Sequence, residues 1–276
     1  EKGVLESKYS YLLFCDDDNW LNEDYLQRAF EIMENDQEIG MLGGEGIAIS
    51  DDVLPEWFYS LQGMFAIGPQ NAKVGDITSE KGYVYGACCV LRLKYWKNIL
   101  DKNVKLLLTD RKGEQTTGGG DNEIGYLLSA AGYKIFWSPN LVFKHYIPKS
   151  RLSVDYIRKL RRGFATNYEM LKVYKYKLKL IPKGRLKNSV IGDLLDSSRI
   201  MMTLWLKLKI GRITKIQFIL HYYFHGRRIV EIVKNGAGYP EIHHLIENNI
   251  NQARSCVSIQ HPDKVDNNNS SLYIRK

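Results

Sequence analysis

The stretch YLLFCDDDNWLNEDYL, residues 11–26, sets Asp16, Asp17 and Asp18 directly behind the apolar run of residues 11–15. A short, continuously apolar run is typical of a strand buried on both faces of a mainly parallel sheet. The carboxyl ends of such strands form the edge at which open α/β sheets bind ligands. Three adjacent carboxylates repel one another unless a positive charge lies among them. The stretch therefore predicts an acidic site at a strand end, with a divalent cation as the simplest partner.

The residues behind the aspartates predict a helix and a second strand. Asn22 is a good N-cap residue, and apolar side chains recur at helical spacing as far as Met33, so we expect a helix that ends near Asn35. The segment IGMLGGEG, residues 39–46, predicts a strand that runs into a glycine-rich loop. Strand, helix and strand together predict a right-handed βαβ unit.

The pattern continues as an α/β protein up to about residue 150. Residues 57–81 have poor periodicity and predict a long connection over the site, and VYGACCVLR, residues 84–92, predicts another buried strand. In it, Gly86 and Ala87 are small enough for a ligand to approach the backbone. A helix over residues 122–131, Gly132 at its C-terminus and two short strands should follow. We predict a mainly parallel sheet flanked by helices.

Charge divides the chain into segments. Residues 1–140 carry a net charge of −9, residues 141–235 carry +17, and residues 236–276 are neutral. We expect a catalytic α/β part over 1–150, a basic helical region over 151–235 with helices at 152–168, 186–206 and 213–233, and a partly disordered tail over 236–276, disordered from 261 onward.

Cysteine content and hydropathy indicate where in the cell the protein is located. The cysteines (Cys15, Cys88, Cys89 and Cys256) form neither a disulfide framework nor a zinc motif, which favours a cytoplasmic location. No apolar run is long enough to span a bilayer, and no signal peptide opens the chain. The chain starts without Met in what looks like the middle of an α/β protein, so we expect an N-terminal truncation.

Each of the two acidic motifs also fits a simpler structural role. The aspartate triplet could be a solvated loop, but an EF-hand is disfavoured by Leu21 at the position that requires Gly, and a phosphatase motif by Trp20. The second motif, GGGDNE at residues 118–123, fits a glycine loop with Asp121 as a helix N-cap. It also fits a second carboxylate pair, Asp121 and Glu123, so that one motif binds a metal while the other abstracts a proton.

Taken together, YLLFCDDDNWLNEDYL, GACCVLR, GGGDNEIGYLLSAAGYKIFWSPNLVFKH and the basic helix that follows resemble a family 2 glycosyltransferase of the GT-A fold, over roughly residues 1–165. The resemblance implies that Asp16 and Asp18 hold Mg²⁺ or Mn²⁺ on the diphosphate of a nucleotide sugar, with Asp17 near the ribose or sugar. It implies that Asp121 is the general base. Gly120 replaces the Glu of the family's Gly-Glu-Asp-x-Glu motif, whereas Asp121 and Glu123 are retained.

The resemblance implies an inverting transfer from a nucleotide-diphospho-sugar to a glycan or lipid-linked acceptor. A divalent ion stabilises the departing diphosphate as a Lewis acid, and a carboxylate takes the proton of the acceptor hydroxyl. Polysaccharide, lipopolysaccharide and protein glycosylation all remain open. The family's nucleotide-binding half should precede residue 1, so the chain as given can be inactive.

Further residues have two interpretations each. His145 is either a third metal or diphosphate contact, as in some relatives, or a structural residue. Arg158, Arg161 and Arg162 either reach the diphosphate or form a solvated face. Trp57, with the neighbouring aromatic residues, is either a platform for the acceptor sugar or a cap on the core.

The basic helices allow three interpretations: peripheral contact with an anionic membrane at its cytoplasmic face, nucleic-acid binding, or simple packing on the catalytic part. No zinc, RNP or helix-turn-helix pattern is present, so we expect no nucleic-acid partner. The alternative to an enzyme is a non-catalytic basic module for membrane or nucleic acid, which explains the two acidic motifs poorly.

Overall fold

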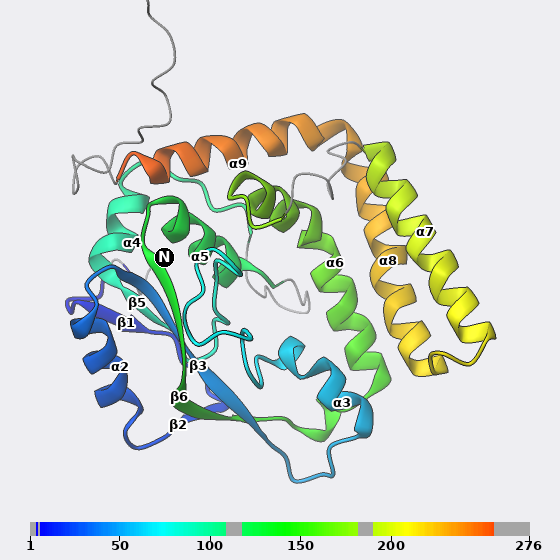
Figure 1. The fold of residues 1–276 in the computed structure, drawn as a ribbon, viewed down its shortest axis with the longest axis horizontal. Helices are drawn as coiled ribbons and strands as arrows, with labels where there is room; N and C mark the ends of the chain where they lie inside the picture. Colours follow the sequence, from blue (N-terminus) through cyan, green and yellow to red (C-terminus); the bar gives the residue numbers. More distant parts are fainter. Residues whose placement is uncertain (1–3, 5, 109–117, 182–189, 257–276) are drawn as a thin grey trace, which may run out of the picture.

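A mixed sheet forms the centre of the computed structural model, which describes residues 4, 6–108, 118–181 and 190–256 (Figure 1). Its strands run in the order β1-β5-β3-β6-β2, and β4 pairs with β6 beside this path. The strands are β1 (Tyr11–Leu13), β2 (Asn19–Leu21), β3 (Ile39–Ile49), β4 (Gly75–Asp76), β5 (Val90–Arg92) and β6 (Lys134–Tyr146).

The sheet is not mainly parallel, and that prediction was wrong. Only the β3–β6 pairing is parallel among the described strands, whereas β1–β5, β3–β5, β2–β6 and β4–β6 are antiparallel. β1 lies at the end of the strand order, yet its residues are apolar on both sides because helices cover both faces of the sheet: Leu12 packs in one core cluster, Tyr11 and Leu13 in another. A continuous apolar run therefore indicates that a strand is buried on both faces, but it does not indicate whether the strand pairs in a parallel or an antiparallel manner.

Helices cover the sheet on both faces and extend to one side of it (Figure 1). They are α2 (Tyr25–Asn35), α3 (Glu56–Leu61), α4 (Leu93–Leu100), α5 (Gly120–Ala130), α6 (Val154–Lys177), α7 (Val190–Lys209), α8 (Lys215–Asn235) and α9 (Tyr239–Arg254), with the short 3-10 helices η1 (Gln62–Phe65), η2 (Lys149–Arg151) and η4 (Gly236–Gly238). One core cluster joins α2 to the sheet. The other joins the opposite face to α4, α5, α6 and α9.

Helix α2 ends at Asn35, as predicted, but begins at Tyr25 with Asp24 as its N-cap residue. Asn22 does not cap it, because its backbone N–H donates to Val142 O (3.2 Å) and so continues the pairing of β2 with β6. The buried face of α2 consists of Tyr25, Ala29 and Met33.

The glycine-rich segment after residue 40 is strand and not loop. A Cβ on Gly43 would lie 2.5 Å from Val84 Cβ, and one on Gly44 would lie 2.2 Å from Leu141 O. Only glycine allows neighbouring chains to approach β3 this closely. β3 therefore runs unbroken through the glycines to Ile49.

Other element boundaries also differ from the predictions. Residues 57–81 contain α3 from Trp57 onward, η1 and β4, and of residues 84–92 only β5 is strand. The chain turns at Cys88, whose φ of 53° lies in the left-handed region. β6 is one long strand where two were expected, with a register irregularity opposite Gly43 and Glu45.

The basic half is helical, as expected. Figure 1 shows α7 and α8 side by side at the outer end of the molecule, with α6 between them and the sheet. The predicted tail contains α9, which is not a tail because Ile246, Ile250 and Ala253 are buried in the main core cluster. The segment 261–276, expected to be disordered, lies outside the described residues, as does the start of the helix predicted from residue 186. Of the helices described, none combines the length and apolarity that crossing a membrane requires.

Candidate active site

The aspartate triplet follows β1 and turns the chain into β2. The side chains of Asp16 and Asp17 are exposed, that of Asp18 is about one-fifth exposed, and Asn19 is buried. β2 pairs with β6 in the register Asn19–His145, and the backbone N–H of Tyr146 donates to Asp18 O (2.8 Å). This register brings Asp18 beside His145, two residues that are far apart in the sequence.

Asp18, His145 and Arg151 form a polar cluster. Arg151 Nη1 donates to Asp18 Oδ2 at 2.7 Å and lies 3.5 Å from His145 Nε2, which is 3.6 Å from Asp18 Oδ2. On the other side of the ring, His145 Nδ1 lies 2.7 Å from the carbonyl oxygen of Phe65. Because a carbonyl only accepts, Nδ1 carries the proton and Nε2 presents a lone pair to the cluster.

The electrostatics of the cluster keep His145 neutral. Burial lowers its pKa, the positive charge of Arg151 lowers it further, and Asp18 opposes both effects. A neutral imidazole whose Nδ1–H is held by a backbone carbonyl is the usual form of a metal-ligating histidine. Asp18 and His145 thus offer one oxygen and one nitrogen donor to a cation.

Asp16 does not join these two donors. Among the described residues, no group of three or more His, Cys, Asp or Glu side chains is arranged to hold a metal ion. Arg151 was not singled out in the sequence, although it lies only six residues beyond His145, past Pro148. Its guanidinium supplies a positive charge to Asp18 from the chain itself.

Asp121 lies in the first turn of α5, whose N-cap residue is Gly119 with φ 123°. Its carboxylate accepts from Gly86 N (Oδ2, 2.8 Å) and from Asn122 N (Oδ1, 2.8 Å). A Cβ on Gly86 would lie 3.1 Å from Asp121 Cβ, so a small residue is needed there. Asp121 is therefore not the helix N-cap and is held against the segment that leads into β5.

The turn of residues 86–89 connects the two acidic motifs. At one end it binds Asp121 through Gly86 N. At the other end, Phe14 N donates to Cys89 O (2.9 Å), and Cys88 Sγ lies 4.0 Å from Cys15 Sγ. The pKa of Cys88 is raised chiefly by burial, then by Cys15, with a smaller contribution from the charge of Asp16. Both acidic motifs thus flank one short turn.

Glu123 lies two residues after Asp121 and is fully buried. Its carboxylate accepts from Leu107 N (3.0 Å), Leu108 N (2.8 Å) and Tyr174 Oη (2.6 Å). Burial raises its pKa more than these hydrogen bonds lower it. The contacts of Glu123 join α5 to the segment before it and to α6.

Lys81, which no sequence motif pointed to, lies near Asp121. Its Nζ is 4.0 Å from the centroid of the Tyr85 ring and 4.5 Å from that of Tyr83, and it is buried with no hydrogen-bond partner among the residues that the structure describes. Burial lowers its pKa to about 8, against the attraction of Asp121. Lys81 lies in a turn that closes on Ile77 O, so its place beside Asp121 has no signal in the sequence.

The remaining predicted residues lie apart from these contacts. Ala87 is half-buried and packs in the α2 core cluster. Trp57 is half-buried on α3 and contacts Phe58, with ring centroids 6.4 Å apart.

The arginines of α6 contact other helical residues. Arg158 pairs with Asp155 (2.9 Å) and its guanidinium lies 4.3 Å from the ring centroid of Tyr223. Arg161 lies 6.0 Å from the ring centroid of Phe224.

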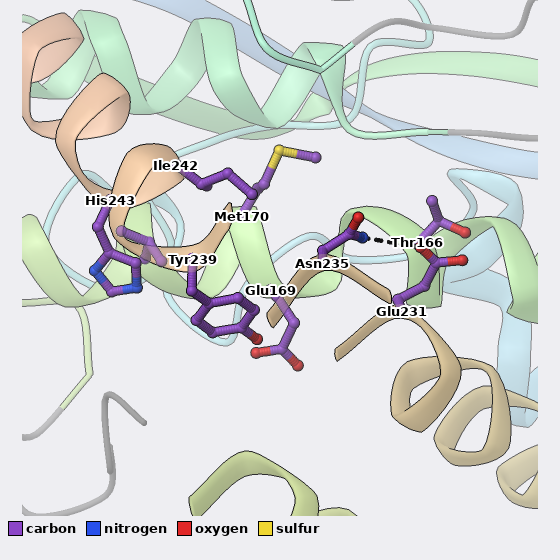
Figure 2. Close-up of a pocket in the computed structure, with 9 residues that line it drawn as sticks. Thr166, Glu169, Met170, Glu231, Asn235, Tyr239, Ile242 and His243 are labelled. Atoms are coloured by element: carbon purple, nitrogen blue, oxygen red, sulfur yellow. Dashed lines mark hydrogen bonds between the residues drawn. The ribbon is translucent and has the colours of Figure 1, made fainter. Parts of the chain in front are cut away.

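Figure 2 shows a pocket enclosed by α6, α8 and α9, with Glu169, Glu231, Asn235, Tyr239 and His243 among its lining residues. Its volume of about 30 Å³ is comparable to the share of one water molecule in liquid water. The pocket is too small for a sugar or a nucleotide, so it is not the active-site cleft.

No protein-family model and no curated protein matches the chain. Among solved structures, the chain is similar to a crystal structure of TarS residues 1–349 from S. aureus in complex with UDP. The TM-score is 0.35 and the sequence identity 13%, and the alignment covers 94% of this chain and 69% of that one. A similarity of this size leaves the assignment of function to the residues of the site.

Proposed function

We propose that this chain is a glycosyltransferase that moves a sugar from a nucleotide-diphospho-sugar to a hydroxyl of a glycan or lipid-linked acceptor. The observation that supports it most is the turn of residues 86–89, which is flanked by Asp121 on one side and by the segment of Cys15 and Asp16 on the other. A transferase of this kind needs a positive site for the leaving diphosphate and a base for the acceptor within one cleft.

In this proposal, Asp18 and His145 are the residues that would hold Mg²⁺ or Mn²⁺. The ion would act as a Lewis acid on the leaving diphosphate. The neutral imidazole and the carboxylate fit such an ion, because both present lone pairs to the same space. Arg151, paired with Asp18, is placed to contact the diphosphate when the cation enters, since guanidinium groups bind phosphate oxygens in a bidentate fork. Asp16 and Asp17, both exposed, are proposed to contact the donor.

Asp121 is proposed to take the proton of the acceptor hydroxyl as that oxygen attacks the anomeric carbon and the bond to the diphosphate breaks. One displacement of this kind inverts the anomeric centre. Gly86 N holds the carboxylate in place, and its charge raises the pKa of the nearby Lys81 against the effect of burial. Glu123, buried and fully engaged, is proposed to position α5 and not to touch substrate.

The test is donor hydrolysis and transfer from a panel of nucleotide sugars, with Mn²⁺, Mg²⁺ or EDTA. Asp121→Asn should lower turnover by about 10²–10⁴-fold, the usual contribution of a general base. The matched control is Asp101→Asn, an exposed aspartate after α4 that should leave turnover unchanged. Full turnover by Asp121→Asn would remove the assigned base.

A binding experiment covers the case in which the chain turns over no donor. Calorimetry with UDP and Mn²⁺ should show that Asp18→Asn abolishes the metal-dependent part of binding. Binding that is equally tight with EDTA, or unchanged in Asp18→Asn, would contradict the metal site.

A specific observation also favours peripheral contact of the α7–α8 helices with an anionic membrane surface. Large apolar side chains are exposed along α7 and at its end, among them Ile191, Leu195, Met202, Trp205, Leu206 and Ile210. Lys207 and Lys209 lie between them, a mixture that suits an interfacial helix. Co-sedimentation with anionic and neutral vesicles tests this contact: Trp205→Ser and Lys209→Gln should each weaken binding to anionic vesicles, and equal failure to bind either vesicle contradicts it.

A further inference from the structure

An open hollow of about 270 Å³ lies between η1 and the helices α6 and α8. Its lining residues are Ser60, Leu61, Gly63, Met64, Arg161, Phe164 and Phe224. Small-molecule sites usually begin near about 300 Å³, so this hollow can take a charged fragment of a larger molecule. Within the part of the chain that the structure describes, no carboxylate lines it, and its only charged lining residue is Arg161.

The guanidinium of Arg161 lies in this hollow without an anionic partner among the described residues. Its Nε is buried and has no hydrogen-bond partner, and burial alone lowers the pKa of the group. The other arginines of its helix are different: Arg158 pairs with Asp155, and Arg162 is exposed. Arg161 is half-buried, and an oxyanion ligand in the hollow would supply charge-assisted hydrogen bonds to its guanidinium, whose Nε has no partner among the described residues.

Arg161 is the charged side chain that lines the hollow among the described residues, and Lys207 and Asp196 act on the two histidines beside it, His221 and His225. Phe224 offers a ring face to the guanidinium. On the next turns of α8, the pKa of His221 and that of His225 are lowered mainly by burial, and the charge of Arg161 lowers both further. Lys207 also acts on His221. The field in the hollow therefore favours an anion.

Two lining residues of the hollow, Gly63 and Phe164, lie beside residues near the proposed base. On one side, a Cβ on Gly63 would lie 2.8 Å from Tyr85 Oη, and the pKa of Tyr85 is raised by burial and by the charge of Asp121. On the other side, a Cβ on Gly118 would lie 3.0 Å from Phe164 Cε1, and Gly118 precedes Asp121 by three residues. A molecule anchored at Arg161 can thus extend toward Asp121.

We propose that this hollow is an acceptor subsite in which Arg161 binds an oxyanion, a phosphate or a carboxylate, carried by the acceptor. The identity of the ligand as acceptor rests on the proposed function, whereas anion binding by Arg161 does not. The site is distinct from the donor diphosphate site at Asp18, His145 and Arg151. The acceptor class is accordingly an anionic glycan or lipid-linked chain.

Calorimetric titration of the full chain with inorganic phosphate, with acetate and with UDP tests the subsite. Arg161→Gln should weaken binding of the preferred small anion by about tenfold or more, the loss of one good charge-assisted contact. Arg161→Lys should keep part of the affinity because the charge remains. The matched control is Arg162→Gln, which makes the same charge change one residue along α6 on an exposed position. UDP binding should stay the same in all three variants.

Three results would overturn the subsite. The proposal is wrong if the unaltered chain binds neither phosphate nor acetate. It is also wrong if Arg161→Gln and Arg162→Gln weaken anion binding equally, because the anion would then respond to the overall positive charge and not to a specific site. A third contradicting result is weaker binding of UDP by Arg161→Gln, because the hollow would then be part of the donor site. Unfolding midpoints of the variants show that each is folded. Failure of sugar transfer alone would contradict the proposed function and leave the anion result standing.

Discussion

Charged side chains are concentrated both at the acidic end of the sheet and in the helical layer of α6, α7 and α8, but the two regions differ in how far these side chains are buried and paired. In the helical layer, the side chain of Arg228 is 2% exposed and pairs with Glu169, Asp193 and Asp196. Lys172 pairs with Glu169 and Asp193 as well. At the sheet end, by contrast, the ion pair of the triplet among the described residues joins Asp18 to Arg151, and both side chains are about one-fifth exposed.

This difference in burial distinguishes charged residues that hold helices together from charged residues that can bind a ligand. A buried network whose members satisfy one another cannot exchange partners without a large loss of free energy. A pair that solvent reaches can open, because water and ions compensate for the lost contact. The same contrast recurs within one turn of α5, between buried Glu123 and half-buried Asp121.

The largest effect on stability is expected for Arg228→Met. It would leave Glu169 and Asp193 buried with Lys172 alone, so the free energy of unfolding should fall by about 3–5 kcal/mol. Arg199→Met is the matched control, because its side chain is 81% exposed and that of its partner Asp196 is 44% exposed; it should cost less than about 1 kcal/mol. Denaturant unfolding measures both, and equal losses would contradict the contrast.

The next effect is expected at Glu123. In Glu123→Gln, the amide group would face the backbone N–H donors of Leu107 and Leu108, so stability should fall by about 2–3 kcal/mol. Asp121→Asn should change stability by less than about 0.5 kcal/mol while it lowers turnover, since its site is accessible. If the two variants lose stability equally, the distinction between a structural and a reactive carboxylate on α5 fails.

A smaller effect is expected for Arg151→Gln. Its pair with Asp18 is about one-fifth exposed on both sides, so the loss in unfolding free energy should be about 1 kcal/mol or less. The variant should bind UDP more weakly, since a phosphate contact is lost as well. A stability loss as large as that of Arg228→Met would show that Arg151 is a structural cation and not one that can move to a ligand.

A further effect concerns pH and Lys81. Because burial lowers its pKa from 10.5 to about 8, the unfolded chain binds a proton between these values that the folded chain has released, and stability should rise with pH over this window. Lys81→Met should flatten the rise, whereas the same change at the exposed Lys73 should not. Denaturant unfolding between pH 7.5 and 9.5 stays below the ionisation of ordinary tyrosines, near about pH 10. The difference between the unaltered protein and Lys81→Met isolates this amine, because Lys175 and the thiols of Cys88 and Cys256, whose pKa values are also shifted by burial, are present in both. An equal rise in both proteins would contradict the buried amine.

Part of the site could be predicted from the sequence because short motifs report local chemistry. The triplet Asp16–Asp18 does follow a strand, and Asp121 does begin a helix after a glycine-rich segment. Arg151 and Lys81 could not be found this way. Their roles depend on β2–β6 register and on the approach of residues 81–86 to α5, contacts between segments far apart in the chain.

The fold shows the same division. Apolar runs and helical periodicity indicated which segments form strands and helices, because the pattern of apolar residues is a property of each segment by itself. Strand direction, the unbroken course of β3 through its glycines and the packing of α9 on the core were decided only by tertiary structure, because they depend on which chains come close. Tertiary contacts also separate the acidic residues: Asp18 pairs with Arg151 at an accessible site where a ligand can bind, whereas Glu123 is buried against Tyr174 and joins two helices.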